Sequence, residues 1–173
     1  ELSDATILGK SGWIFDCEGA FYPDFSWFGK HVNEISFIPR MKPRSRFLRG
    51  ITVSLATDFG VGSYGHFVYD VIPRLHLFYE GGFSFDDVDH IVCPKPTKGH
   101  AEFLLTELDL PPEKMVWIDE HACLRTEKLL ALSFPGTRRN YPKWMPRFIH
   151  SSFFKDLKSP KKSRLFVSRK GYR

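Results

Sequence analysis

Short apolar runs alternate with longer mixed segments through the middle of the chain. Short and almost wholly apolar strands are typical of a parallel sheet that is covered on both faces, and the mixed segments have the length of helices. We therefore expect an α/β fold in which residues 50–158 form a mainly parallel sheet with helices on both faces. The predicted strands are 47–57, 88–94, 114–119 and 129–134, and the predicted helices are 66–78, 99–109 and 146–157.

Residues 1–49 have a different pattern. Short aromatic pieces are broken there by glycine, proline and aspartate, which favours a strand-and-loop N-terminal extension. We expect its aromatic side chains to pack in the core or at an interface, and stacking on sugar rings is the alternative. These side chains are Trp13, Phe15, Phe21, Tyr22, Phe25 and Trp27.

Glycines in the stretch 60–82 predict a loop that leads into a helix. On that helix His66, Asp70 and Arg74 are spaced four residues apart, so we expect them to line one face. Pro73 cannot donate a backbone hydrogen bond, and it is expected to kink the helix between Asp70 and Arg74. Three ionisable side chains on one face of an otherwise apolar helix need partners or a cleft.

The formal net charge of +5 favours anionic partners such as phosphates. Three cysteines without CxxC or CxxH spacing argue against a disulfide framework and against a structural zinc site. No apolar run approaches the roughly 20 residues that span a bilayer, and the N-terminus lacks a signal-peptide pattern. We expect a cytoplasmic protein, with the lumen of the secretory pathway as the alternative.

Two motifs occur after residue 60 of the sequence. The first is G-x-x-x-H-x-x-x-D-x-x-P-R-L, formed by Gly62, His66, Asp70, Pro73, Arg74 and Leu75. The second is S-R-x-x-x-R, formed by Ser168, Arg169 and Arg173. With the strands and helices between these motifs, residues 50–173 resemble the family 61 glycosyltransferases, which include bacterial capsule-polysaccharide enzymes, plant xylosyltransferases and extracellular N-acetylglucosamine transferases.

This resemblance implies a GT-B fold, in which two Rossmann-like domains face each other and the nucleotide donor sits mainly on the second. Residues 50–158 would then be the Rossmann-like acceptor-side domain. Residues 159–173 would be a linker, SPKKS, and the start of the nucleotide-sugar-binding domain. We expect the donor site to be incomplete within this chain.

The implied activity is the inverting transfer of a hexose or pentose from a nucleotide-sugar donor to a saccharide acceptor in glycan or polysaccharide biosynthesis. Neither a metal nor another cofactor is expected, and a peripheral association with membranes is a further expectation. Donor phosphates would be bound by Ser168, Arg169, Lys170 and Arg173, since arginine forks match diphosphate oxygens. A solvated basic tail is the alternative for these residues.

His66 is the candidate general base, because imidazole titrates near neutrality; a core histidine bonded to a backbone carbonyl is the alternative. Asp70 orients this imidazole, acts as the base itself, or forms a simple ion pair with Arg74. Ser63 and Tyr64 begin the helix, where backbone N–H groups suit a substrate oxygen, and an ordinary helix cap is the alternative for Ser63. Arg74 is expected to support substrate binding.

Two other functions compete with sugar transfer. A glycan-binding domain without chemistry is the closer alternative. Nucleic-acid binding is suggested only by the positive charge, and no interleaved basic and aromatic recognition motif accompanies it, so we expect no nucleic-acid partner. A steep loss of binding with salt would distinguish a nucleic-acid binder.

Overall fold

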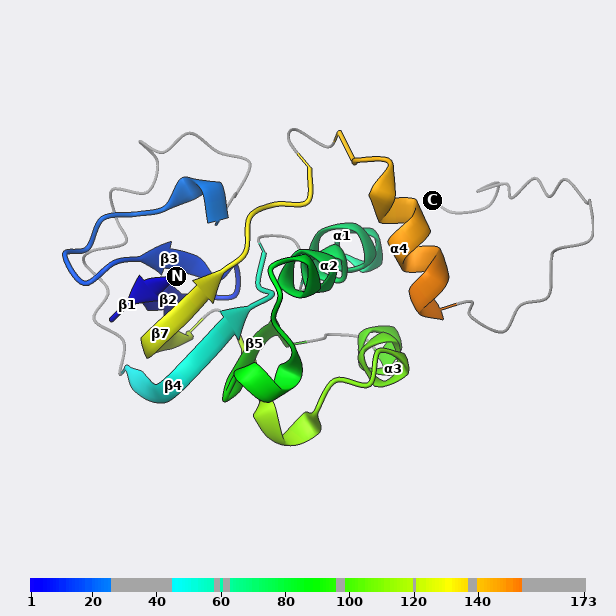
Figure 1. Cartoon of the computed structure of the whole chain (residues 1–173). Coiled ribbons are helices and arrows are strands. Elements are labelled where there is room, and N and C mark those ends of the chain that lie inside the picture. The colour runs from blue at the N-terminus through cyan, green and yellow to red at the C-terminus, as the bar shows by residue number, and fades with distance from the viewer. Residues whose placement is uncertain are drawn as a thin grey trace, which may run out of the picture.

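The structure is a computed structural model that describes residues 1–25, 45–57, 60, 63–95, 99–119, 121–136 and 140–153. Seven strands within these residues form one mixed sheet in the order β3-β2-β7-β4-β5-β6, and β1 also pairs with β7. Helices accompany the sheet, so an α/β fold is confirmed (Figure 1). The strands are β1 Leu2–Ser3, β2 Thr6–Leu8, β3 Trp13–Phe15, β4 Arg46–Ser54, β5 His90–Pro94, β6 Met115–Ile118 and β7 Cys123–Ala131, and the helices are α1 Tyr64–His66, α2 Pro73–Glu80, α3 Gly99–Glu107 and α4 Trp144–Phe153.

Strands β4 to β7 form the parallel part of the sheet. Strand β4 lies between β7 and β5 and is parallel to both, and β6 is parallel to β5. Every antiparallel pair involves the N-terminal strands β1, β2 or β3. The predicted parallel sheet is therefore confirmed for the described residues after β3.

Helices cover one face of this parallel part. Val53 of β4 is paired with Ile91 of β5, so the two side chains point to the same side of the sheet. Both are completely buried there against residues of α2 and α3. The apolar side chains of this helix-side core are Val53, Leu55, Phe67, Val71, Ile72, Leu75, Phe78, Val88, Ile91, Cys93, Leu105, Leu110 and Leu130.

The N-terminal strands, rather than helices, cover the opposite face in the part of the chain that the structure describes. A second core brings Ile7 of β2 and Ile14 of β3 together with Val92 of β5 and Ile118 of β6. Figure 1 shows β1, β2 and β3 on the side of β4 that faces away from α1, α2 and α4. The expectation of helices on both faces is corrected accordingly, and the N-terminal strands are part of the sheet.

A β-bulge interrupts the pairing of β4 with β7 near Gly50. The register of β4 against β7 shifts between Leu48 and Ile51, where Gly50 has a φ of +78°. The backbone N–H of Gly50 donates to the Glu127 carboxylate at 2.7 Å, and the N–H of Ile51 donates to Asp89 at 2.8 Å. Because a bulge bends and twists its strand, β4 curves visibly in Figure 1.

The turn between β2 and β3 offers a test of this packing. Gly12 has a φ of +66°, and a Cβ built there would lie 2.2 Å from the Cβ of Ala56. We expect Gly12→Ala to lower the free energy of unfolding by about 3 kcal/mol, since overpacking costs roughly 1–3 kcal/mol and a left-handed alanine roughly 1–2 kcal/mol. Urea unfolding of the variant measures the loss.

Gly19 is the matched control for this substitution. Its φ is +84°, and nothing lies within 4 Å of a Cβ built there. Gly19→Ala should therefore lose only the backbone contribution, roughly 1–2 kcal/mol. Equal losses in the two variants would contradict the contact of the β2–β3 turn with Ala56.

Aromatic side chains of the N-terminal region pack on one another, as expected from the sequence. The rings of Trp13 and Phe21 lie 6.3 Å apart, and those of Phe15 and Phe21 lie 5.2 Å apart. Tyr22 stacks on Phe25 at 6.1 Å. Trp27 lies outside the described residues.

None of the helices described by the structure is long and apolar enough to cross a bilayer.

Candidate functional site

The order of the parallel strands reverses between β4 and β7. From β4 the chain proceeds to β5 and β6 on one side, and β7 then pairs with β4 on the other side. In open α/β sheets, ligands bind outside the carboxyl ends of the strands where the order reverses in this way. The described residues that directly follow β4 and β7, 55–57 and 132–136, leave the sheet at this edge.

Residues 64–80, which follow β4, form a helical segment with a change of helix type. Helix α1 is followed by a π-helical turn at Phe67–Val71, and α2 begins at Pro73. The N–H of Ile72 donates to the carbonyl of Phe67, five residues back, at 3.1 Å. The irregularity expected at Pro73 therefore takes the form of a wide turn just before it, a feature that is frequent at functional sites.

His66 and Asp70 form a hydrogen-bonded pair on this segment. Nδ1 of His66 lies 2.6 Å from Oδ2 of Asp70, and 27% of the His66 side chain and 17% of the Asp70 side chain are exposed. An ionised carboxylate only accepts hydrogen bonds, so Nδ1 carries the proton and the lone pair of the neutral ring lies on Nε2. The arrangement suits a base that is oriented by a carboxylate.

Ser63 caps the helix, which was the alternative to a role in binding a substrate oxygen. Its Oγ accepts a hydrogen bond from the backbone N–H of His66 at 3.4 Å, which satisfies one of the donors at the helix start. Tyr64 is the next residue, and 56% of it is exposed. The cap fixes the backbone of the first turn and thereby the position of the His66 ring.

Arg74 does not share the exposed face of His66 and Asp70. The π-helical turn adds a residue to one turn of the helix and rotates the following positions, and the Arg74 side chain is 0% exposed. Its Nη2 donates to the Phe25 carbonyl at 3.1 Å, and its guanidinium lies 4.6 Å from the centre of the Phe134 ring. The three ionisable residues therefore do not share one exposed face, although the charge of Asp70 still acts on the buried Arg74. Among the described residues, Asp70 is paired with His66, and Arg74 forms no ion pair with Asp70.

Two tyrosines that the sequence analysis did not select lie at the same edge. Tyr69 precedes Asp70 in the π-helical turn, and Tyr141 lies just before α4. Their rings stack with centroids 5.2 Å apart, although 44% of Tyr69 and 40% of Tyr141 remain exposed. Tyr69 is visible in the sequence as an aromatic neighbour of Asp70, whereas only the fold brings Tyr141 to it.

Residues 154–173 lie outside the described part of the chain. The predicted donor-phosphate residues Ser168, Arg169, Lys170 and Arg173 fall there, and so do the linker at 159–163 and the expected start of the nucleotide-sugar-binding domain. Their roles stay predictions. In the described residues, no group of three histidine, cysteine, aspartate or glutamate side chains is placed to hold a metal ion.

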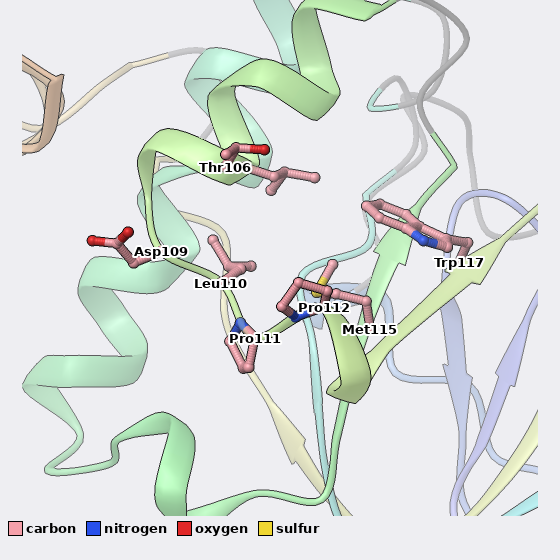
Figure 2. Close-up of a pocket in the computed structure, with 8 residues that line it drawn as sticks. Thr106, Asp109, Leu110, Pro111, Pro112, Met115 and Trp117 are labelled. Atoms are coloured by element: carbon pink, nitrogen blue, oxygen red, sulfur yellow. The ribbon is translucent and has the colours of Figure 1, made fainter.

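A separate pocket lies at the β6 edge of the sheet. It has a volume of about 480 Å³ and is formed by the end of α3, the following turn and β6. Figure 2 shows the Asp109 carboxylate turned away from Met115 and Trp117. The pocket is therefore mainly apolar and offers little acid–base chemistry. It is lined by Leu105, Thr106, Asp109, Leu110, Pro111, Pro112, Met115 and Trp117.

The His66–Asp70 pair at the β4–β7 edge is thus the best candidate site for chemistry among the described residues. Comparison of the chain with models of protein families finds no match, and no curated protein or solved structure is significantly similar to it.

Proposed function

We propose that the protein transfers a sugar from a nucleotide-sugar donor to a hydroxyl group of a saccharide acceptor, with inversion at the anomeric carbon. The observation that carries this proposal is the 2.6 Å hydrogen bond between His66 and Asp70, on the helical segment that follows a parallel strand at its carboxyl end. Such an edge is where α/β proteins bind their ligands, and an inverting transfer needs one base to activate the acceptor.

The proposed reaction uses the two residues in distinct roles. Nε2 of His66 takes the proton from the acceptor hydroxyl, and the oxygen attacks the anomeric carbon of the donor sugar. As the new C–O bond forms, the bond from that carbon to the nucleoside diphosphate breaks, and the diphosphate leaves with the electron pair. Asp70 holds the imidazole through Nδ1 and stabilises the imidazolium that forms. Arg169 and Arg173 are proposed to neutralise the departing diphosphate.

The strand order supports the proposal that the parallel part of the sheet belongs to a Rossmann-like domain of GT-B type. Taken along the sheet, the parallel strands lie in the order β6-β5-β4-β7, which corresponds to the first four strands of a doubly wound sheet. A GT-B enzyme places its acceptor side on such a domain. The proposal therefore assigns the β4–β7 edge to the acceptor.

Tyr69 and Tyr141 are proposed to bind the acceptor by stacking against a pyranose ring. We expect Tyr69→Ala and Tyr141→Ala each to raise the KM for the acceptor about fivefold, because loss of one aromatic contact costs about 1 kcal/mol. Tyr69→Phe keeps the ring and should retain the KM. Steady-state transfer kinetics measure these values.

Phe103 on α3 is the matched control for the tyrosine variants, because 61% of it is exposed on a helix that does not follow β4 or β7. Phe103→Ala should leave the KM for the acceptor unchanged. An equal rise in KM for this control, or unchanged values for both tyrosine variants, would contradict acceptor binding at the tyrosine pair.

Glycan binding without chemistry is the second candidate function, and the exposed Tyr69–Tyr141 stack favours it. An assay that follows nucleoside diphosphate release from a panel of nucleotide sugars, with and without saccharide acceptors, separates the two candidates. We expect release that depends on an acceptor. Saccharide binding with no release from any donor by the complete protein would favour the second candidate.

A further inference from the structure

Arg74 is a buried cation with unused hydrogen-bond donors. It is 0% exposed and is the largest fully buried side chain in the described residues. Nη2 donates to the Phe25 carbonyl, whereas Nε and Nη1 have no hydrogen-bond partner among the described residues. Three of the five N–H groups of a guanidinium reside on those two nitrogens.

Burial is unfavourable for the charge of this side chain, which forms no ion pair among the described residues. Desolvation lowers the pKa of Arg74 to about 10, and the nearby charge of Asp70 opposes the shift. The guanidinium therefore stays charged at neutral pH. Its other close contacts are the Phe25 carbonyl and the Phe134 ring, and neither carries a negative charge. A buried cation needs a paired anion to offset the loss of its hydration.

Arg74 also lies at the ligand-binding edge of the sheet. It is in the first turn of α2, in the segment after β4, and it contacts Phe134 just beyond the end of β7. We propose that Arg74 binds an oxyanion, a phosphate or carboxylate group of a ligand, at the edge between β4 and β7. Planar guanidinium groups bind such oxygens with paired hydrogen bonds. Because the side chain is fully covered, binding requires a local rearrangement, and the Phe25 carbonyl is the acceptor that an oxyanion would displace.

Thermal unfolding of the complete chain tests the proposal without relying on sugar transfer. The probes are pyrophosphate and glucuronate, each compared with sodium chloride at the same ionic strength. At a hundredfold excess over its Kd, a bound probe should raise Tm by about 5 °C. Stabilisation by pyrophosphate alone identifies a phosphate-bearing ligand, and stabilisation by glucuronate alone identifies an acidic sugar.

Arg74→Met and Arg125→Met provide the matched comparison. Arg125 is exposed on β7, 6.0 Å from the centre of the Phe47 ring, so its replacement removes the same charge from the surface. Arg74→Met should melt at or above the wild-type temperature without a probe, since an apolar side chain replaces a buried ion, and it should lose the response to the probe. Arg125→Met should keep that response.

Arg74→Lys extends the test if the methionine variant does not fold. It keeps the positive charge but loses the planar donors, so the probe should bind about tenfold more weakly than to the wild type. A wild-type protein that neither probe stabilises beyond the chloride control would overturn the proposal. A response that survives unchanged in Arg74→Met or Arg74→Lys would also overturn it.

Discussion

Replacing His66 by alanine is expected to reduce the rate of sugar transfer by a factor of about 100 to 10,000, the usual contribution of a general base. The side chain is partly exposed and forms a hydrogen bond with Asp70, one helical turn away. The free energy of unfolding should therefore change little. The kcat of transfer and the urea unfolding curve, measured on the same preparation, report the two effects separately.

Asp70→Asn and His121→Ala are the comparisons for this result. The asparagine keeps the shape of Asp70 but removes the charge that stabilises the imidazolium, so kcat should fall by a similar factor. His121 is exposed in the turn before β7, and its replacement should leave kcat unchanged. A His66→Ala protein that transfers sugar at the wild-type rate would exclude the proposed base. A variant that loses its fold would favour a structural role for His66.

Phe78→Ala is expected to have the largest effect on stability, a loss of about 3–5 kcal/mol. Phe78 is 0% exposed and joins α2 to the helix-side core. Its ring stacks on Phe83 at 5.9 Å and on Phe85 at 5.7 Å. Removal of the ring leaves a cavity between the sheet and the segment that carries His66 and Asp70. Urea unfolding measures the loss.

Phe103→Ala is the control for this core substitution. Because most of the Phe103 side chain is exposed, its loss should cost less than about 0.5 kcal/mol. A loss below about 1 kcal/mol for Phe78→Ala would mean that α2 is not held on the sheet by this core.

Local patterns were sufficient to predict most elements of the sheet. The apolar runs at 88–94 and 114–119 correspond to β5 and β6, because buried parallel strands are apolar throughout. The first half of β7 was missed, since Arg125 and Glu127 interrupt the apolar pattern. Its buried positions, Leu124 and Thr126, alternate with those exposed charges, which is the period of a strand with one buried face.

The covering of the second face was not predictable from local patterns. Contacts such as that of Gly12 with Ala56 join residues far apart in the sequence, and they depend on the curvature of β4 at Gly50. A glycine in a strand pattern indicates a bulge, but it does not indicate which segment then packs on the sheet.

The candidate site was predicted in part for a similar reason. The spacing of His66 and Asp70 is local, and the structure brings them together as expected. The burial of Arg74 was not predicted, because spacing along a helix does not indicate which positions a distant segment such as Phe25 covers. Tyr141 was missed because a tertiary contact, rather than spacing along the helix, brings it to Tyr69.

We propose above all that the edge between β4 and β7 binds a saccharide. Titration of protein carrying ¹³C-labelled histidine, tyrosine and tryptophan with a panel of saccharide acceptors, followed by NMR, tests this claim directly. We expect the signals of His66, Tyr69 and Tyr141 to shift together, with one dissociation constant, while the signal of Trp117 in the β6-edge pocket stays in place. Shifts confined to Trp117, or no shift with any saccharide, would contradict it.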